Sequence, residues 1–224
     1  MTAQGAPPVR AVGSEALIVD LAGTAEVLAL RAALERETPR GVRELIAAAR
    51  TLLVTYDPAV TGHEALAAEV TRRAADAAGD ATGGVTREVP GTAGAGLAPL
   101  TVPVRYDGPD LAEVAGLTGL TSAQVIARHT APDYTVAFAG FAPGFGYLTG
   151  TDPVLRLPRR AEPRTEVPAG AVAVAGGFTG IYPRSSPGGW QLLGTTALPL
   201  WDERRDPPAL LVPGRTVRLR EVPR

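Results

Sequence analysis

Two stretches decide how the second half of this chain folds: AFAGFAPGFGYLTG at residues 137–150 and LPRRAEPRTEVPAGAVAVAGGFTGIYPRSSPGGWQLLGT at residues 157–195. Seven prolines fall between Pro143 and Pro187, and each proline fixes φ and removes a backbone donor. The interleaved glycines permit conformations that other residues avoid. This composition excludes a long helix or a plain hairpin. It predicts shaped loops between short strands, and such loops on a rigid scaffold often carry binding residues.

Short strands and two short helices are predicted around these stretches. Thr121 is expected to cap the second helix, and the acid at Asp110 suits the start of the first. The small-residue strand at 171–175 suits a crowded barrel interior or a close neighbouring backbone. Many short strands with frequent turns predict a β-barrel or sandwich. The expected helices are 110–115 and 121–130, and the expected strands are 100–106, 134–138, 171–175, 190–193, 209–212 and 216–221.

The first half of the chain has a different pattern, in the order β-α-β-β-α. Thr24 is a candidate helix N-cap, and a last strand at Thr86–Val89 would complete a split βαβ, ferredoxin-like sandwich. The Gly-rich stretch PGTAGAGLAP is the expected linker. The predicted domains are therefore 1–89 and 100–224, joined by 90–99. The other elements expected in the first half are strands at 16–21, 42–48 and 51–56 and helices at 24–37 and 62–78.

Composition predicts an ordinary globular protein of 224 residues, with 45% hydrophobic and 20% charged residues. A formal net charge of −1 gives no reason to expect nucleic acid or a membrane as a partner. No apolar run approaches the ~20 residues that span a bilayer. The start MTAQGAPPVR is not followed by the apolar stretch of a signal peptide. We therefore expect a cytoplasmic location.

Two residue types are missing from the chain, and both absences exclude chemistry. Without cysteine there are no disulfides, zinc-thiolate sites or thiol nucleophiles. All 22 cationic residues are arginine, so the chain cannot supply the lysine of a P-loop, of a pyridoxal phosphate Schiff base or of a biotin attachment site. The two histidines lie far apart in the sequence, so no metal site is predicted.

Several residues of the second half could carry chemistry. His129 either ends a helix, where it satisfies carbonyls and the dipole, or acts as a binding or acid/base group facing the aromatic loop. Phe141, Phe145 and Tyr147 either pack in the core or line a ligand site, since glycines between them allow close approach. The glycines at 188–189 could offer backbone amides to an anion, whereas Trp190 is expected in the core.

Arginines dominate the same region. Five of them face only Asp152, Glu162 and Glu166, which leaves two excess positive charges. Arginine presents a planar fork that matches a carboxylate or phosphate, although a solvated loop is the alternative. Neighbouring prolines stiffen the loop and so reduce the entropy lost when an arginine is positioned. The five arginines are Arg156, Arg159, Arg160, Arg164 and Arg184.

The motifs GFAPGFGYL, LPRRAEPRTEVPAGAVAVAGGFTGIYP and SPGGWQLLG closely resemble the family of bacterial 5-oxoprolinase B subunits. This family is also labelled allophanate hydrolase subunit 1 and includes the KipI inhibitor. The resemblance covers nearly the whole chain, including TLLVTYDP, DGPDLAEVA and VIARHTA. This chain departs from the family at Thr195, where an arginine is common, and at Gly146, where many members have alanine.

The resemblance implies an α+β protein with a small α/β domain and a cyclophilin-like β-barrel. It implies a stable partner, the C subunit (similar to allophanate hydrolase subunit 2), and a third partner, the A subunit. Together the three would open 5-oxo-L-proline, a small lactam, to L-glutamate with ATP, which the partners would bind wholly or in part. Alternatives are a carboxyltransferase or allophanate hydrolase-type subunit that acts on urea-like amides, or a KipI-like inhibitor of a sensor histidine kinase. A prolyl isomerase would rest on the barrel alone.

Candidate roles follow from signature position and residue type. Arg159 and Arg164 would bind a carboxylate or phosphoryl group, and His129 and Tyr147 would orient the substrate or donate a proton near its carbonyl. Phe141 and Phe145 would form aromatic walls. The remaining candidates would supply backbone amides or a polar lining: Gly188, Gly189, Thr179, Tyr182 and Gln191.

Overall fold

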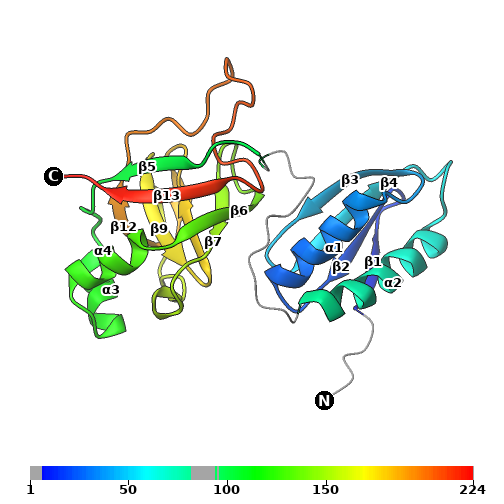
Figure 1. Cartoon of the computed structure of the whole chain (residues 1–224), viewed down its shortest axis with the longest axis horizontal. Coiled ribbons are helices and arrows are strands. Elements are labelled where there is room, and N and C mark those ends of the chain that lie inside the picture. The colour runs from blue at the N-terminus through cyan, green and yellow to red at the C-terminus, as the bar shows by residue number, and fades with distance from the viewer. Residues whose placement is uncertain (1–6, 82–93, 95, 224) are drawn as a thin grey trace. The chain divides into compact units, whose positions relative to one another are not determined.

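The chain divides into two compact units, residues 1–92 and 93–224. The computed structural model describes residues 7–81, 94 and 96–223 (Figure 1). The predicted strand Thr86–Val89 lies outside the described residues, as do 90–93 and 95 of the predicted linker. The secondary structure is mixed α and β, as the α+β prediction requires. No helix in the described part of the chain is long and apolar enough to cross a membrane.

The first unit is an antiparallel four-stranded sheet with two helices. The sheet has the order β1-β2-β4-β3. Alternation along β4 buries Leu52, Val54 and Tyr56, which is the period-2 pattern of a sheet with one covered face. Helical spacing buries Leu30 and Leu34 of α1. The elements are β1 (Val9–Val12), β2 (Ala16–Asp20), α1 (Thr24–Arg36), β3 (Val42–Ala47), β4 (Thr51–Tyr56) and α2 (His63–Ala81).

Two details of this unit differ from expectation. β1 was not predicted, and it pairs antiparallel with β2 at the edge of the sheet. Thr24 is not the N-cap of α1, because Gly23 takes that position without a side-chain bond. The Thr24 hydroxyl instead donates to the Ala49 carbonyl at 2.8 Å. The hydroxyl therefore donates to a distant carbonyl instead of accepting from an amide of α1. The ferredoxin-like description remains a prediction.

The second unit is built on a seven-stranded, nearly closed barrel-like sheet, consistent with a cyclophilin-like barrel. The strand order is β12-β9-β10-β7-β6-β13-β5, and the parallel pair is β13 with β5. A bridge between Arg105 and Thr195 brings the two edges together, with N–H···O distances of 2.9 and 2.8 Å. A separate β8–β11 pair lies outside this sheet. The strands are β5 (Leu100–Val104), β6 (Asp133–Ala139), β7 (Gly146–Thr149), β8 (Arg164–Val167), β9 (Ala171–Ala175), β10 (Phe178–Ile181), β11 (Ser186–Gly188), β12 (Gln191–Thr195) and β13 (Thr216–Glu221).

Two helices, α3 (Leu111–Thr118) and α4 (Ser122–Thr130), lie side by side at one end of the barrel (Figure 1). The predicted cap of the second helix is confirmed, since Thr121 and Gln124 form a capping box. The 3₁₀ turn η1 (Pro153–Leu155) follows β7. The predicted strand 209–212 is wrong, because only an isolated bridge joins Ala209 to Trp201 there. Strands β7, β8, β10 and β11 were not predicted, because prolines and glycines in or beside them interrupt the pattern by which a strand is recognised.

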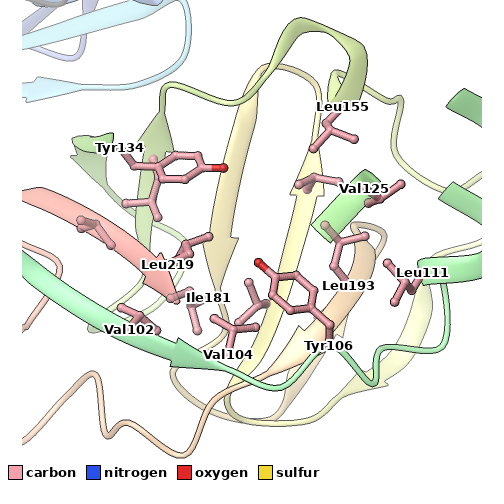
Figure 2. Close-up of a cluster of buried hydrophobic side chains, with 14 of the residues drawn as sticks. Val102, Val104, Tyr106, Leu111, Val125, Tyr134, Leu155, Ile181, Leu193 and Leu219 are labelled. Atoms are coloured by element: carbon pink, nitrogen blue, oxygen red, sulfur yellow. The ribbon is translucent and has the colours of Figure 1, made fainter. Parts of the chain in front are cut away.

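The barrel interior is aliphatic, with two tyrosines directed inward (Figure 2). Val172 and Val174 of β9 belong to this core. The alternating alanines of β9 belong instead to a second apolar cluster on the outer face of the sheet. The small-residue strand therefore separates two packed layers. Its alanines make room for the aromatic side chains of the outer layer.

Candidate functional site

The outer face of the barrel sheet carries a group of aromatic side chains in mutual contact. Ring centroids lie between 4.4 Å, for Phe138 and Tyr147, and 6.1 Å, for Phe141 and Tyr182. Most pairs meet edge to face, which suits the quadrupoles of aromatic rings. The group, here called the aromatic cluster, consists of Phe138, Phe141, Phe145, Tyr147, Phe178, Tyr182 and Trp190.

Phe141 stands at the exposed end of the aromatic cluster in a strained conformation. Its φ is +70°, the only positive value at a non-glycine residue in the described chain, and this region is costly for a bulky side chain. Its side chain is also 58% exposed. Backbone bonds hold the turn, with Phe145 N donating to Ala142 O at 2.9 Å and Ala142 N to Gly140 O at 2.8 Å. The turn therefore presents an aromatic side chain to solvent.

Tyr182 is buried against the backbone of β11. A Cβ at Gly188 would lie 2.3 Å from the Tyr182 hydroxyl oxygen, so only glycine fits there. The Trp190 backbone amide lies close enough to this hydroxyl to lower its pKa. The Gly189 carbonyl accepts from the Arg160 amide at 2.7 Å. The glycine pair thus fixes Tyr182 and anchors residues 156–163, here called the arginine loop.

Arg159 lies close enough to the aromatic cluster to influence its tyrosines. Burial raises the pKa of Tyr147 and of Tyr182, and the positive charge of Arg159 opposes the rise at both hydroxyls. Arg159 is exposed, and within the described residues its guanidinium has no hydrogen bond or ion pair. It is therefore a cation beside two phenols and available to an anion.

The neighbouring arginines form ion pairs with two acids from outside their own segment. Asp110, at the start of α3, is almost fully buried and accepts from Arg160 at 3.0 Å and from Arg164 at 2.6 Å. Arg160 also pairs with Glu113 at 2.7 Å. Asp110 is the N-cap residue of α3, as its predicted place at the helix start requires, but its side chain makes no cap hydrogen bond. The predicted excess of positive charge is thereby reduced around Arg159.

A separate polar group lies inside the barrel. His129 is fully buried, with Nδ1 2.8 Å from the Tyr106 hydroxyl and Nε2 3.1 Å from Thr179 Oγ1. Thr151 Oγ1 is also 3.1 Å from Thr179 Oγ1, and the Tyr134 hydroxyl donates to the His129 carbonyl at 2.8 Å. Burial lowers the pKa of His129 to about 3. The imidazole is therefore neutral near pH 7.

The sheet separates the predicted site residues into two groups. The aromatic cluster and its surroundings bring together Tyr147, Arg159, Arg164, Phe141, Phe145, Tyr182, Gly188 and Gly189. His129 and Thr179 lie on the core side, and register places Gln191 there too, opposite Val174. The Oε1 atom of Gln191 is buried without a partner. The catalytic role of His129 stays a prediction, and its geometry gives it a structural role.

Sequence reasoning missed the part that Asp110 plays here. The only signal was the charge imbalance of the arginine segment, which required an acid from elsewhere. Thr195, where the resemblance expected arginine, donates its hydroxyl to Asp107 at 2.9 Å. Arg105 supplies a guanidinium to the same carboxylate at 2.6 Å. Among the described residues, no group of three or more His, Asp or Glu is placed to hold a metal ion.

This chain belongs to the family of carboxyltransferase domains, subdomains C and D, whose model matches residues 7–211. It is 52% identical over 122 residues to the 5-oxoprolinase B subunit of Escherichia coli O157:H7, covering 53% of this chain and 56% of that protein. Relatives from Haemophilus influenzae and Bacillus subtilis carry the same name. The chain spans about half the length of the curated relatives it matches.

Two solved structures extend the likeness to nearly the whole chain. TTHA0988 is 38% identical with a TM-score of 0.70, covering 94% of this chain and 40% of that one. The conserved uncharacterized protein PH0987 from Pyrococcus horikoshii is 32% identical with a TM-score of 0.54, covering 96% and 97%. The predicted family resemblance is confirmed.

Proposed function

We propose that this chain is a subunit of an ATP-dependent 5-oxoprolinase, which opens 5-oxo-L-proline to L-glutamate together with its A and C subunits. Support comes from membership of the carboxyltransferase C and D family and from three curated relatives named as 5-oxoprolinase B subunits at 47–52% identity. The C subunit would be the stable partner, and the A subunit would be needed for full activity.

The observation that carries the proposal is the unpaired Arg159 beside the aromatic cluster. The proposed substrate combines a small lactam ring with a carboxylate. Arginine suits a carboxylate because its guanidinium can donate two parallel hydrogen bonds. Phe141 offers an exposed apolar wall to the ring, with Phe145 and Tyr182 buried beneath it, and the half-buried Tyr147 offers a hydroxyl near Arg159. Since Asp110 already occupies Arg160 and Arg164, an incoming anion would meet Arg159 first.

The nucleotide is assigned to the partners wholly or in part. The chain has no lysine, so it has no P-loop, and it offers no attachment site for biotin or pyridoxal phosphate. Because the reaction uses ATP, we place the complex in the cytoplasm, where ATP is supplied. We also propose that 1–89 is a ferredoxin-like domain with β1 as an added edge strand, that 90–99 is the linker, and that 100–224 is a cyclophilin-like barrel.

Reconstitution with the A and C subunits tests the proposal through ATP-dependent release of glutamate. Replacing Arg159 by alanine removes a charged hydrogen bond of ~1.5–3 kcal/mol, so we expect the KM for 5-oxoproline to rise about 10- to 100-fold. Arg156→Ala is the matched control, because Arg156 is also exposed and has no ion pair in the described structure.

Two results would overturn parts of this proposal separately. A wild-type complex without 5-oxoproline-dependent glutamate release would contradict the assigned reaction, and turnover of a urea-like amide would favour the carboxyltransferase alternative. If the wild-type complex is active and Arg159→Ala matches Arg156→Ala, Arg159 does not bind the substrate.

A further inference from the structure

Asp110 connects three separate parts of the barrel unit. Its side chain is about 3% exposed, and Oδ1 accepts from Arg160 Nη1 at 3.0 Å and from Arg164 Nη2 at 2.6 Å. Oδ2 accepts from the Leu192 amide at 2.7 Å. The Asp110 amide donates to the Leu192 carbonyl at 3.1 Å. The bonds to Leu192 therefore fix Asp110 to β12 of the barrel wall independently of either arginine.

These contacts are among those that position the arginine loop. Residues 156–163, between η1 and β8, form no helix or strand. Pro158 and Pro163 restrict φ at two positions, and the Arg160 amide donates to the Gly189 carbonyl. Leu157 packs against the barrel core, and its carbonyl accepts from the Gly176 amide at 2.6 Å. The ion pairs of Arg160 in the loop and of Arg164 at the start of β8 converge on the same Asp110 oxygen. Arg159 is the immediate neighbour of Arg160.

We propose that Asp110 is a positioning residue for Arg159. By holding Arg160 and Arg164 against β12, its carboxylate sets the course of the loop and thereby places the Arg159 guanidinium beside Tyr147 and Tyr182. Together with Glu113, the same carboxylate balances the charges of Arg160 and Arg164, so that Arg159 is left as the cation without an ion pair beside the two tyrosines. The expected effect on the KM for 5-oxoproline rests on the proposed function, whereas the expected effect on the position of Arg159 does not.

Both consequences follow from the geometry of Asp110 and the two arginines bound to it. A buried carboxylate that accepts three hydrogen bonds is rigid, and arginines held in this way lose their rotamer freedom on folding rather than on binding a ligand. Without the charge on Asp110, Arg164 would lose its ion pair, and Arg160 would keep the pair with Glu113 and its backbone bond to Gly189. The Arg160 side chain would then be held at the rim by Glu113 instead of against β12, and the position of Arg159 would be less restricted.

Tyrosine ionisation tests the structural consequence on the full-length chain alone. Tyrosine labelled with ¹³C at Cζ would be titrated by NMR, with Tyr147→Phe and Tyr182→Phe assigning the signals. Arg159→Ala should raise the pKa of both phenols, because it removes the opposing positive charge. Asp110→Asn, which is isosteric, should also raise both as Arg159 moves away. The Tyr147 signal is decisive, because Arg164 also lowers the pKa of Tyr182 whereas Arg159 is the charge that acts on Tyr147. Loss of the Asp110 charge without movement would lower them, so unchanged or lowered values overturn the proposal.

Glu162→Gln is the matched control for charge removal. Glu162 is exposed, lies in the same loop and has no hydrogen bond or ion pair among the described residues. Glu162→Gln should leave the pKa values of both tyrosines unchanged. A rise equal to that in Asp110→Asn would mean that any acid near the loop has the same effect, which would overturn the specific role of Asp110. Should Asp110→Asn fail to fold, Arg160→Gln replaces it, because that side chain is partly exposed. The same rise in both phenols is expected for this variant.

Kinetics in the reconstituted complex test the functional consequence. A binding group displaced by ~1 Å can cost ~100-fold. Asp110→Asn should therefore raise the KM for 5-oxoproline about 10- to 100-fold, with a much smaller change in kcat. Glu162→Gln should match wild type. A fall of about 10- to 100-fold in the kcat of Asp110→Asn, with an unchanged KM, would contradict the positioning role. If the wild-type complex is inactive, the proposed function fails, and the tyrosine titration still decides the positioning role.

Discussion

At the scale of single residues, His129 shows how burial fixes the state of a titratable group. Its ring is enclosed by Tyr106, Tyr134 and Thr179. The residues facing it are neutral, so nothing compensates a positive charge there. Since burial lowers its pKa to about 3, the folded state excludes a proton that the unfolded chain binds below about pH 6.5.

We expect this difference to make acid destabilise the fold through His129. Between pH 6.5 and about 3 the unfolded state binds one more proton, so the free energy of unfolding falls as the pH falls, by up to ~1.4 kcal/mol per pH unit. His129→Gln cannot titrate and lacks this contribution. Urea denaturation at several pH values should show the gap between the wild-type and variant chains narrowing toward low pH. Parallel curves would contradict the prediction.

At the scale of elements, β9 and β10 form a thin wall between two packed layers. Their inward residues belong to the barrel core, whereas the aromatic cluster lies on the outward side. Gly180 of β10 lies directly under two rings. A Cβ there would be 2.8 Å from the rings of both Phe145 and Trp190. The absence of a side chain lets these rings touch the sheet.

Gly180→Ala should therefore destabilise the protein by about 1–3 kcal/mol through overpacking and alter the fluorescence of Trp190. Gly177→Ala provides the control in the same hairpin, because a Cβ there has nothing within 4 Å and its φ is not positive. It should change the free energy of unfolding by less than about 0.5 kcal/mol. If Gly180→Ala and Gly177→Ala lowered the free energy of unfolding equally in urea denaturation, contact of the two rings with Gly180 would not explain the packing.

At the scale of the whole barrel unit, closure depends on two backbone segments that approach very closely. The Arg105–Thr195 bridge joins the edges of the sheet. Gly194 permits the approach, since a Cβ there would lie 2.3 Å from the Arg105 carbonyl oxygen. Gly108 has the same function against Leu192 and Leu193.

Gly194→Ala should open this seam and cost about 3 kcal/mol, because rigid backbone atoms have to move. Hydrogen exchange should show lost protection at the Arg105 and Thr195 amides before the rest of the sheet. Gly116→Ala, in α3 with open space around its Cβ, should instead stabilise the chain by about 0.5–1 kcal/mol. Retained protection at the seam in Gly194→Ala would show that closure does not depend on this glycine.

The sequence by itself determined the elements with regular patterns and the family. The stretch TLLVTY followed by Asp57-Pro58 identified β4, helical spacing identified α1, and Thr121 marked the start of α4, because these signals act between residues close in the chain. The Pro/Gly/Arg signature identified the family from residue types alone. Short strands such as β10 and β11 had no such pattern, since their pairing rather than their composition makes them strands.

Only the tertiary structure decided which residues share a site. Residues adjacent in sequence point to opposite faces of a strand, so Thr179 and Gln191 lie on the core side although their neighbours support the aromatic cluster. Asp110 joins Arg160 and Arg164 across about fifty residues of chain. No local pattern encodes such a pairing, because an ion pair depends on distance in space, and only closure of the barrel brings α3, β12 and the arginine loop together.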